Sequence, residues 1–361
     1  MSFQNRINNL KTKLSNLGLD GMYVTNLTNV RYLTGFAGSA GSLLILDNEQ
    51  YFFSDGRYKE QSKEQIKNCQ IQIVGSSHIN AIKKMNLLSD DVKIGFESNH
   101  VSVSLYNNFT NLFPLVHWKE TAGIIEKIAA VKDILEIDSL KTAIEITDEV
   151  FKQIIPELKI GAVEKDISAK ISYLFKTNGA EGDSYESIIG SGYLGALPHA
   201  RPSDKAFEDG DFVVMDFGAL YNGYHADMTR TVVIGSATER HKEIYDIVLE
   251  SQSQGISIAK AGITGAEVDN ACRTVITEAA DGKYKDKFIH STGHGIGLEV
   301  HTYPGINKLN NEALLENYVI TIEPGIYIEG WGGVRIEDDC WIQKETCKPL
   351  NTSTKEMLIL K

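Results

Sequence analysis

Apolar residues recur every three or four positions at the start of the chain, at Phe3, Ile7, Leu10, Leu14 and Leu17. This spacing places them on one face of a helix, which we expect to end near Gly18. Short apolar runs that suit strands follow at residues 21–25, 42–47, 50–55, 71–74 and 92–96, with polar helix-like stretches at 56–67 and 78–88. Strands that alternate with helices predict an α/β domain whose sheet is largely covered.

The pattern changes near residue 124. A long amphipathic stretch covers residues 128–160 and is broken near Pro156, and further helical patterns cover residues 164–177, 238–259 and 265–280. Strand-like segments occupy residues 211–218, 224–234, 318–328 and 334–343. Helices between antiparallel strand pairs predict an α+β domain. We therefore expect an N-terminal α/β domain at residues 1–123 and a separate α+β domain at residues 124–361.

Charge and cysteine content exclude several classes of protein. The 361 residues carry a net charge of −12, which argues against nucleic acid or an anionic membrane as a partner. No apolar span reaches the ~18 residues of a membrane helix, and the N-terminus lacks the apolar segment of a signal peptide, so we expect a cytoplasmic protein. The four cysteines form no C-x-x-C pair, so neither a disulfide framework nor a zinc ribbon is expected.

Two aspartates flank a turn in the segment DFVVMDFGALYNGYHADMTRT. Asn222-Gly223 is a favoured two-residue hairpin turn because both positions need positive φ. With this turn, Asp216 lies opposite Thr229, and Asp227 lies opposite Gly218. The two aspartates are then diagonal neighbours on one face of the hairpin, roughly 7–8 Å apart at the backbone, and can share a cation. Gly218 is expected to leave open space beside Asp227.

A second strand pair carries two glutamates, in TIEPGIYI and VRIEDDCWI. A turn centred on Gly330 sets Glu323 directly opposite Glu337, whereas a neighbouring register moves them apart. Like charges that face each other across a sheet are destabilising unless something cationic lies between them. Each acid taken alone would suit a salt bridge, for which Arg230 and Arg335 are available. Four acids would need four such partners, and the apolar strands contain too few basic residues.

A histidine-rich segment, STGHGIGLEVH, carries His294 and His301, with His290 just upstream. The glycines of this segment disfavour a helix, so it differs from the H-E-x-x-H helix of zinc proteases. The glycines also lack the G-x-G-x-x-G spacing of a dinucleotide-binding site. Glycine here instead lets the backbone approach a metal or ligand closely. His199 stands in the loop-like segment GALPHARPSD. We expect His294 as a metal ligand, and His199 and His301 as acid/base or substrate contacts.

Together the acids and one histidine form a hard, oxygen-rich ligand set: Asp216, Asp227, His294, Glu323 and Glu337. Buried carboxylates need protons, cationic partners or metal ions. The set carries roughly four negative charges, which two divalent cations would neutralise. The residues therefore predict a two-metal hydrolase.

The chain resembles the proline-specific metallopeptidases of the pita-bread fold, a family with Xaa-Pro aminopeptidase (aminopeptidase P), Xaa-Pro dipeptidase (prolidase) and methionine aminopeptidase. The resemblance runs through ALPHA, GDFVVMDFGALYNGYHADMTRT, STGHGIGLEVH, TIEPGIYI and GGVRIED. It implies a C-terminal pita-bread (creatinase/aminopeptidase) fold preceded by a creatinase-like α/β domain that serves substrate gating or dimerisation. VRYLTGFAGSAGSLLI followed by SDGRY is most similar to the aminopeptidase P branch.

The resemblance also implies a cofactor and roles for single residues. Two divalent ions are expected, most simply Mn²⁺, with Co²⁺ or Zn²⁺ as alternatives. Asp216 would bind one ion, His294 and Glu323 the other, and Asp227 and Glu337 both. His199, His290 and His301 would line the substrate site, with Arg335 and Tyr327 behind it. The partners implied are peptides that begin with Xaa-Pro and a second copy of the chain in a homodimer.

These roles suggest a mechanism for cleaving an amide whose nitrogen belongs to proline. Glu323 is the candidate general base, which passes a proton to the leaving nitrogen. His301 or His199 would hydrogen-bond the tetrahedral oxyanion. Arg335 would orient the carboxylate ligands through bidentate bonds.

We therefore expect a Xaa-Pro aminopeptidase, which releases the N-terminal residue from peptides with proline in the second position, and three alternatives to it remain open. A metal-free relative of creatinase would hydrolyse an amidine, and a non-catalytic binding module could keep the fold, although both would be expected to lose ligand residues. Within the peptidases, a Xaa-Pro aminopeptidase leaves the far side of proline open to longer peptides. A Xaa-Pro dipeptidase instead needs a cation or a blocking loop that recognises the free carboxylate of its substrate.

Overall fold

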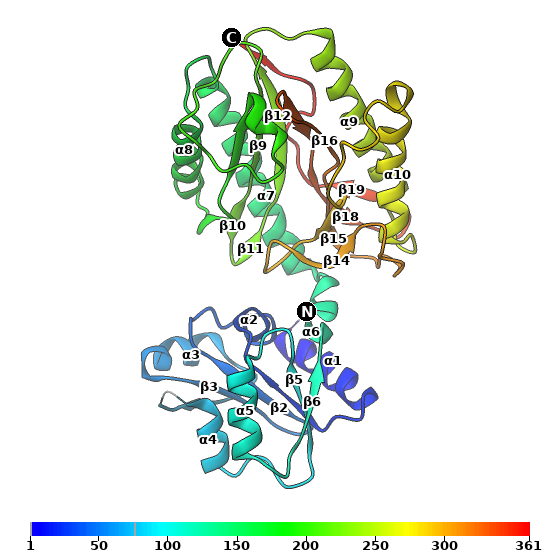
Figure 1. Cartoon of the computed structure of the whole chain (residues 1–361). Coiled ribbons are helices and arrows are strands. Elements are labelled where there is room, and N and C mark those ends of the chain that lie inside the picture. The colour runs from blue at the N-terminus through cyan, green and yellow to red at the C-terminus, as the bar shows by residue number, and fades with distance from the viewer. Residues whose placement is uncertain (1, 76) are drawn as a thin grey trace. The chain divides into compact units, whose positions relative to one another are not determined.

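The computed structural model describes residues 2–75 and 77–361. Its contacts divide the chain into two compact units, Met1–Ala129 and Ala130–Lys361. Figure 1 shows both units, each built from helices and sheet. Among the described residues, we find no helix with the length and apolar character needed to cross a membrane.

The N-terminal unit is a six-stranded sheet with helices on both faces. Its strands are β1 (Gly21–Val24), β2 (Ser42–Leu46), β3 (Gln50–Ser54), β4 (Gln70–Ile73), β5 (Lys93–Glu97) and β6 (His117–Thr121). Its helices are α1 (Phe3–Asn16), α2 (Leu27–Thr34), α3 (Lys59–Gln65), α4 (His78–Lys84) and α5 (Val103–Leu112), followed by α6 (Ile124–Ala130). The strand order is β4-β3-β2-β1-β5-β6, with β2 antiparallel to both neighbours and the other pairs parallel.

Alternation along the strands explains why this sheet is covered. Tyr23, Leu44 and Phe53 point to the face where Ile79 and Ile82 of α4 and Phe109 of α5 pack. Successive strand residues point to opposite faces, and the intervening residues are buried as well. The expected α/β domain with its opening helix and five strands is therefore present, and α2, α5 and β6 are added to it.

The second unit contains four long helices, α7 (Ile134–Ile154), α8 (Glu164–Thr177), α9 (Glu239–Ile258) and α10 (Gly265–Glu278). The amphipathic stretch expected at residues 128–160 does break near Pro156, but its expected start was wrong, because α6 and α7 are separate helices. Asp133 is the N-cap residue of α7 and separates this helix from α6. Its side chain accepts hydrogen bonds from the backbone N–H groups of Leu135 and Glu136 and forms a capping box with Glu136. Such a cap stabilises a new helix start.

Short strands fill the space between the helix pairs. They are β7 (Gly182–Asp183), β8 (Ile188–Ser191), β9 (Phe212–Phe217), β10 (Ala219–Tyr221), β11 (Tyr224–His225), β12 (Met228–Ile234), β13 (Gly293–Gly295), β14 (Thr302–Ile306), β15 (Val319–Ile322), β16 (Gly325–Ile328), β17 (Gly332–Arg335), β18 (Asp338–Ile342), β19 (Cys347–Pro349) and β20 (Ile359–Leu360). The sheets have the orders β11-β10-β7, β20-β12-β9-β8, β14-β13-β15-β18-β19 and β16-β17.

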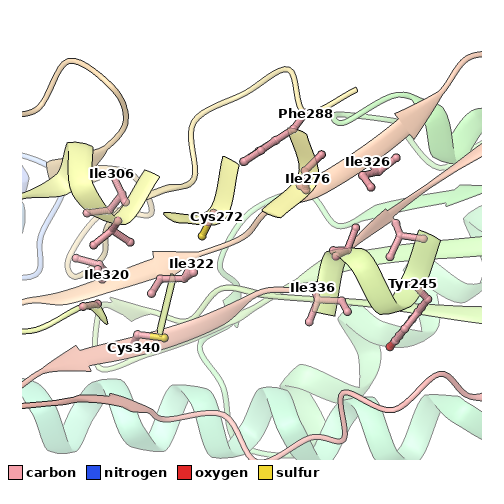
Figure 2. Close-up of a cluster of buried hydrophobic side chains, with 14 of the residues drawn as sticks. Tyr245, Cys272, Ile276, Phe288, Ile306, Ile320, Ile322, Ile326, Ile336 and Cys340 are labelled. Atoms are coloured by element: carbon pink, nitrogen blue, oxygen red, sulfur yellow. The ribbon is translucent and has the colours of Figure 1, made fainter. Parts of the chain in front are cut away.

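Each helix pair has its own hydrophobic core against the strands. On one side, Phe151 and Phe175 from α7 and α8 pack with Met215 and Val232 from β9 and β12. On the other side, α9 and α10 cover β15, β16 and β18 through a cluster that includes Tyr245, Cys272, Ile320 and Cys340 (Figure 2). Burial of each large apolar side chain contributes about 1.5–3 kcal/mol. The acidic strands thus lie between two helical layers (Figure 1).

Candidate metal centre

The first acidic hairpin has the register expected from its turn. Asn222 and Gly223 have φ of 49° and 75°, which are the positive values required by the two-residue turn. Asp216 pairs with Thr229 in the β9–β12 ladder. The local turn chemistry therefore decides which face Asp216 occupies, because a shift of one residue would turn the side chain to the opposite face.

Gly218 does not provide open space, so that expectation was wrong. A Cβ atom at Gly218 would lie 1.7 Å from the carbonyl oxygen of Ala226. The two backbones meet here, and the ladder is interrupted between β11 and β12. The backbone N–H of Asp227 instead donates to Oδ2 of Asp339 at 3.0 Å. Glycine is thus needed for a close backbone approach that re-aims Asp227.

The second acidic strand pair also keeps its expected register. Ile322 pairs with Asp338 in β15–β18, and Gly325 pairs with Arg335 in β16–β17. One register continues across the gap between these sheets, so Glu323 and Glu337 face each other. Both glutamates lie where the ladder is interrupted, as Asp227 does in the first hairpin.

The two strand pairs meet at the acids. The backbone N–H of Glu337 donates to the carbonyl of Thr229 at 3.2 Å, and the Thr229 hydroxyl donates to Oε2 of Glu337 at 2.6 Å. Ligand atoms of Asp227, His294 and Glu337 all lie within 4.8 Å of one another. Oxygen and imidazole nitrogen at this spacing suit a divalent ion.

Burial leaves this negative charge poorly compensated. Burial, and then the charge of Asp216, raises the pKa of Asp227 well above its usual range. Burial, and then Asp227, raises the pKa of Glu337 in the same way. Burial raises the pKa of Glu323 to about 8, although Arg335 opposes the shift. Carboxyl groups with such shifts need either protons or cations.

His294 has the geometry of a metal ligand. Its Nδ1 lies 3.1 Å from the carbonyl of Gly295 and must donate to it, which leaves the lone pair of Nε2 free. Nε2 lies 3.6 Å from Asp227 Oδ2 and 3.4 Å from Glu323 Oε1. Burial, reinforced by nearby His301, lowers the pKa of His294 to about 4. The imidazole is therefore neutral and faces the acids.

A salt-bridge explanation accounts for one of the four acids. Arg335 donates from Nη2 to Asp216 Oδ2, whereas Arg230 pairs with Asp338 at 2.7 Å. Arg335 also donates from Nε to the Thr229 hydroxyl at 2.9 Å. It therefore contacts one carboxylate ligand with a single nitrogen, and the expected bidentate bonds are not formed.

The candidate residues border one pocket of about 550 Å³. Its lining includes all five candidate ligands together with His199, His290, His301 and Arg335. Tyr327 lies behind the lining: its hydroxyl accepts from Arg335 Nη1 at 2.8 Å and lies 2.9 Å from His290 Nε2. His199 and His301 are exposed to the pocket.

Two comparisons with known proteins assign the chain to a family. Residues 138–344 match metallopeptidase family M24, and residues 6–131 match the creatinase/prolidase N-terminal domain. The chain belongs to the M24 metallopeptidases.

Relatives of this M24 peptidase cover its whole length. It is 38% identical to the Xaa-Pro dipeptidase of Pyrococcus furiosus, over 98% of this chain and 99% of the relative. Its structure matches the Xaa-Pro dipeptidase from Bacillus anthracis with a TM-score of 0.95 and 38% identity, covering 99% of this chain and 100% of that one. It matches the X-Pro aminopeptidase from Thermotoga maritima with a TM-score of 0.89 and 36% identity, covering 98% and 99%.

These matches confirm the α+β pita-bread fold with its N-terminal creatinase-like domain. They also confirm that the chain is a metallopeptidase. M24 metallopeptidases are dinuclear metal enzymes. The donor set of this M24 peptidase fits such ions, because among the described residues only Asp216 of its four acids has an arginine or lysine partner, and the set includes one neutral imidazole.

The sequence did not reveal Tyr185, which contacts the same acids. Its hydroxyl lies within hydrogen-bond distance of Oδ1 of both Asp216 and Asp227 and is the donor. Burial, and then the charges of Asp216 and Asp227, raises the pKa of Tyr185 well above its usual range, so the phenol keeps its proton. The phenol has one proton, so it donates to one of the two carboxylates at a time. Tyr185 precedes β8 and belongs to no acidic motif, so no local signal pointed to it.

Thr229, Thr321 and Asp339 also support the ligands of this M24 peptidase. Thr321 donates to Glu323 Oε1 at 3.3 Å and accepts from the His294 backbone N–H at 3.1 Å. The register of the first hairpin already placed Thr229 opposite Asp216, so that signal was available. Asp339 follows Glu337 by two residues, but its bond to Asp227 depends on the meeting of two distant strands.

Proposed function

We propose that this M24 peptidase uses two divalent ions to hydrolyse the bond between an N-terminal residue and a following proline. The supporting observation is the convergence of Asp227, His294 and Glu337 in one pocket with Asp216 and Glu323. Its relatives include a Xaa-Pro dipeptidase and an X-Pro aminopeptidase, and these suggest the substrate class.

The five candidate ligands would hold the ions in the proposed arrangement. Asp216 would bind one ion, His294 and Glu323 the other, and Asp227 and Glu337 both. When bound, a pair of divalent ions lowers the pKa of water and polarises a carbonyl group. We propose Mn²⁺, with Co²⁺ and Zn²⁺ as alternatives, because oxygen and nitrogen donors accept several ions.

Glu323 is the proposed general base. Its carboxylate borders the pocket, and a carboxylate beside the reacting water can take a proton and pass it on. The nitrogen of a proline amide has no N–H and must be protonated before it leaves. Glu323 accepts a weak hydrogen bond from Thr321 at Oε1, and it would carry the proton to the proline nitrogen.

Histidines of the pocket would stabilise the oxyanion and hold the substrate. His301 packs against His294 with ring centroids 4.2 Å apart, and burial lowers its pKa, so it is a neutral donor. His199 borders the same pocket. We propose that either one donates a hydrogen bond to the tetrahedral oxyanion.

His290 has a different proposed role. Its Nδ1 must donate to the carbonyl of Ser291, 2.8 Å away, and its Nε2 then accepts from the Tyr327 hydroxyl. Burial, and then Arg335, lowers the pKa of His290 to about 4. Since both ring nitrogens are used, His290 would contact substrate through its ring faces. Arg335 and Tyr327 would position it and Asp216 together.

Two substrate specificities fit this proposed function, those of an aminopeptidase and of a dipeptidase. The aminopeptidase P-like N-terminal motif favours a Xaa-Pro aminopeptidase, and the alternative is a Xaa-Pro dipeptidase. We further propose that the N-terminal unit serves substrate gating or dimerisation, that the enzyme acts as a homodimer, and that it works in the cytoplasm.

Purified protein loaded with Mn²⁺ tests the function. We expect release of alanine from Ala-Pro or Ala-Pro-Ala, none from Ala-Ala or Ala-Ala-Ala, and loss of activity on chelation with recovery after Mn²⁺ is returned. Equal rates on the peptides without proline would refute the proposed specificity. Activity that survives complete chelation would refute the metal mechanism.

A further inference from the structure

Two guanidinium groups line the pocket, and one of them is largely occupied by contacts within the protein. Arg335 is buried, and its Nη1 donates to the Tyr327 hydroxyl and, at 3.2 Å, to the carbonyl of Pro198. Its Nε and Nη2 donate to Thr229 and Asp216. These contacts use four of the five N–H groups of Arg335, so at most one of them is left for a substrate carboxylate.

Arg201 is the other guanidinium of the described lining. Its side chain is 83% exposed, and its ionic neighbour is Glu186, whose Oε2 lies 3.5 Å from Nη1. Glu186 is itself 66% exposed and lines the same pocket. A pair at this distance and exposure contributes little to stability, so an incoming carboxylate can replace Glu186 on Arg201.

The backbone beside Arg201 is held firmly, although its side chain is largely exposed. Glu164 is fully buried and accepts through Oε2 from the backbone N–H and hydroxyl of Ser203. Its other oxygen accepts from the backbone N–H and hydroxyl of Ser191, each at 2.7 Å. This clamp fixes the segment two residues beyond Arg201. The guanidinium is thus presented from a rigid support, which favours recognition.

The Glu186–Arg201 pair also stands next to groups that reach the acidic centre. Glu186 follows Tyr185, whose hydroxyl contacts Asp216 and Asp227. Arg201 lies two residues after His199, which borders the same pocket. The ion pair therefore links the two lining segments that contain Tyr185 and His199.

We propose that Arg201 determines specificity by binding the C-terminal carboxylate of a Xaa-Pro dipeptide in exchange for Glu186. This inference rests on the proposed function. A free carboxylate is otherwise disfavoured in a pocket lined by five acidic side chains, four of them ion ligands, and Arg201 supplies the charge that accepts it. Within the proposed function it favours the dipeptidase over the aminopeptidase, because a longer peptide carries a neutral amide at this point.

The test compares Ala-Pro with its amide, Ala-Pro-NH₂, on the Mn²⁺-loaded enzyme, because the two differ only in the carboxylate. We expect wild-type kcat/KM to be higher for the free acid. Arg201→Ala should lower the ratio of acid to amide about tenfold, on the scale of one charge-assisted hydrogen bond. Glu186→Gln should raise the ratio, since it removes the competing carboxylate. Arg201→Lys should keep part of the preference.

A matched control is Lys165→Ala. Lys165 is an exposed cation that pairs at 2.9 Å with Asp204, three residues after Arg201. Neither Lys165 nor Asp204 belongs to the described lining of the pocket. Its removal should leave the ratio unchanged. The wild-type ratio should also fall as salt is added, because exposed charges are screened.

The outcomes separate the two proposals. Three results would overturn the role of Arg201 while proline-specific hydrolysis stands. They are a wild-type acid-to-amide ratio at or below one, an unchanged ratio in Arg201→Ala, and a lower ratio in Glu186→Gln. Absence of hydrolysis of both substrates by the wild-type enzyme would instead overturn the proposed function, and the role of Arg201 with it.

Discussion

The backbone N–H of Asp227 donates a hydrogen bond to Oδ2 of Asp339, which lies 112 residues further along the chain. Asp339 is fully buried, and its Oδ1 has no hydrogen-bond partner among the described residues. The bond compensates for the interrupted ladder beside Gly218. Asp339 thus fixes the backbone of a candidate ligand that two different strand pairs must present together.

Loss of this bond should weaken metal binding. We expect Asp339→Ala to lower metal affinity about 10- to 100-fold, the usual scale for partners that orient ligands. Asp339→Asn keeps an acceptor oxygen and should retain most of the affinity. Titration of the metal-free proteins with Mn²⁺ measures both. Equal affinity in Asp339→Ala and the wild type would show that Asp339 does not orient Asp227.

Removal of charge from the two proposed bridging ligands should abolish metal binding and turnover together. Asp227→Asn and Glu337→Gln keep nearly the same shape but remove the charge that a shared ion needs. Metal content of the purified variants and their rates on Ala-Pro provide the measurements. Full activity in either variant would contradict its bridging role.

His301 should affect turnover without affecting metal content. His301→Ala removes a neutral donor at the pocket surface, and we expect turnover to fall about 10²–10³-fold, the scale of one lost oxyanion donor. Metal analysis serves as the control and should match the wild type. An unchanged rate would transfer the role to His199, for which the same substitution is the next measurement.

Acid should stabilise the metal-free protein. Burial raises the pKa of Glu323 to about 8 from an ordinary value of 4.5. A raised carboxyl pKa means that the folded state binds the proton more tightly, so its contribution is present below the ordinary value and is lost as pH rises toward 8. Thermal unfolding without metal should show lower stability at pH 8 than at pH 6, and Glu323→Gln should reduce this difference. A difference that is the same in Glu323→Gln would exclude Glu323 as its source.

Arg230 should be a major determinant of stability. Its buried guanidinium pairs with Asp338 and donates to the carbonyls of Glu337 and Ser353. Burial would raise the pKa of Asp338, but Arg230 and Lys355 outweigh it and hold that pKa below its usual range. Removal of one partner of such a pair costs about 3–5 kcal/mol. Urea unfolding of Arg230→Ala measures this loss.

An exposed pair provides the comparison for Arg230. Lys242 and Asp246 form an ion pair on the surface of α9. Such pairs contribute roughly 0–1 kcal/mol, so Lys242→Ala should change the free energy of unfolding little. Similar losses in Arg230→Ala and Lys242→Ala would mean that the buried network stabilises the fold less than its contacts imply.

Local sequence was sufficient wherever a short segment decides its own conformation. Asn222-Gly223 accounts for the register of the first hairpin, and the glycine turn at Gly330 accounts for that of the second. Apolar spacing located α8, α9 and α10 to within a few residues. The capping box of Asp133 could also have been recognised, because the pattern D-x-x-E signals a helix start. The amphipathic pattern that runs past it hid that start.

Only the tertiary structure decided how these segments combine. The contact of Thr229 with Glu337, the bond of Asp227 to Asp339 and the position of Tyr185 between two acids all join residues that are distant in the chain. Arg201 likewise belongs to no motif that the sequence singles out, and only the fold places it in the lining of the pocket. Such contacts depend on how whole layers pack, and packing is a property of the assembled surfaces rather than of local conformational preference. The sequence by itself thus determined which groups bear the chemistry, whereas the fold determined which of them meet.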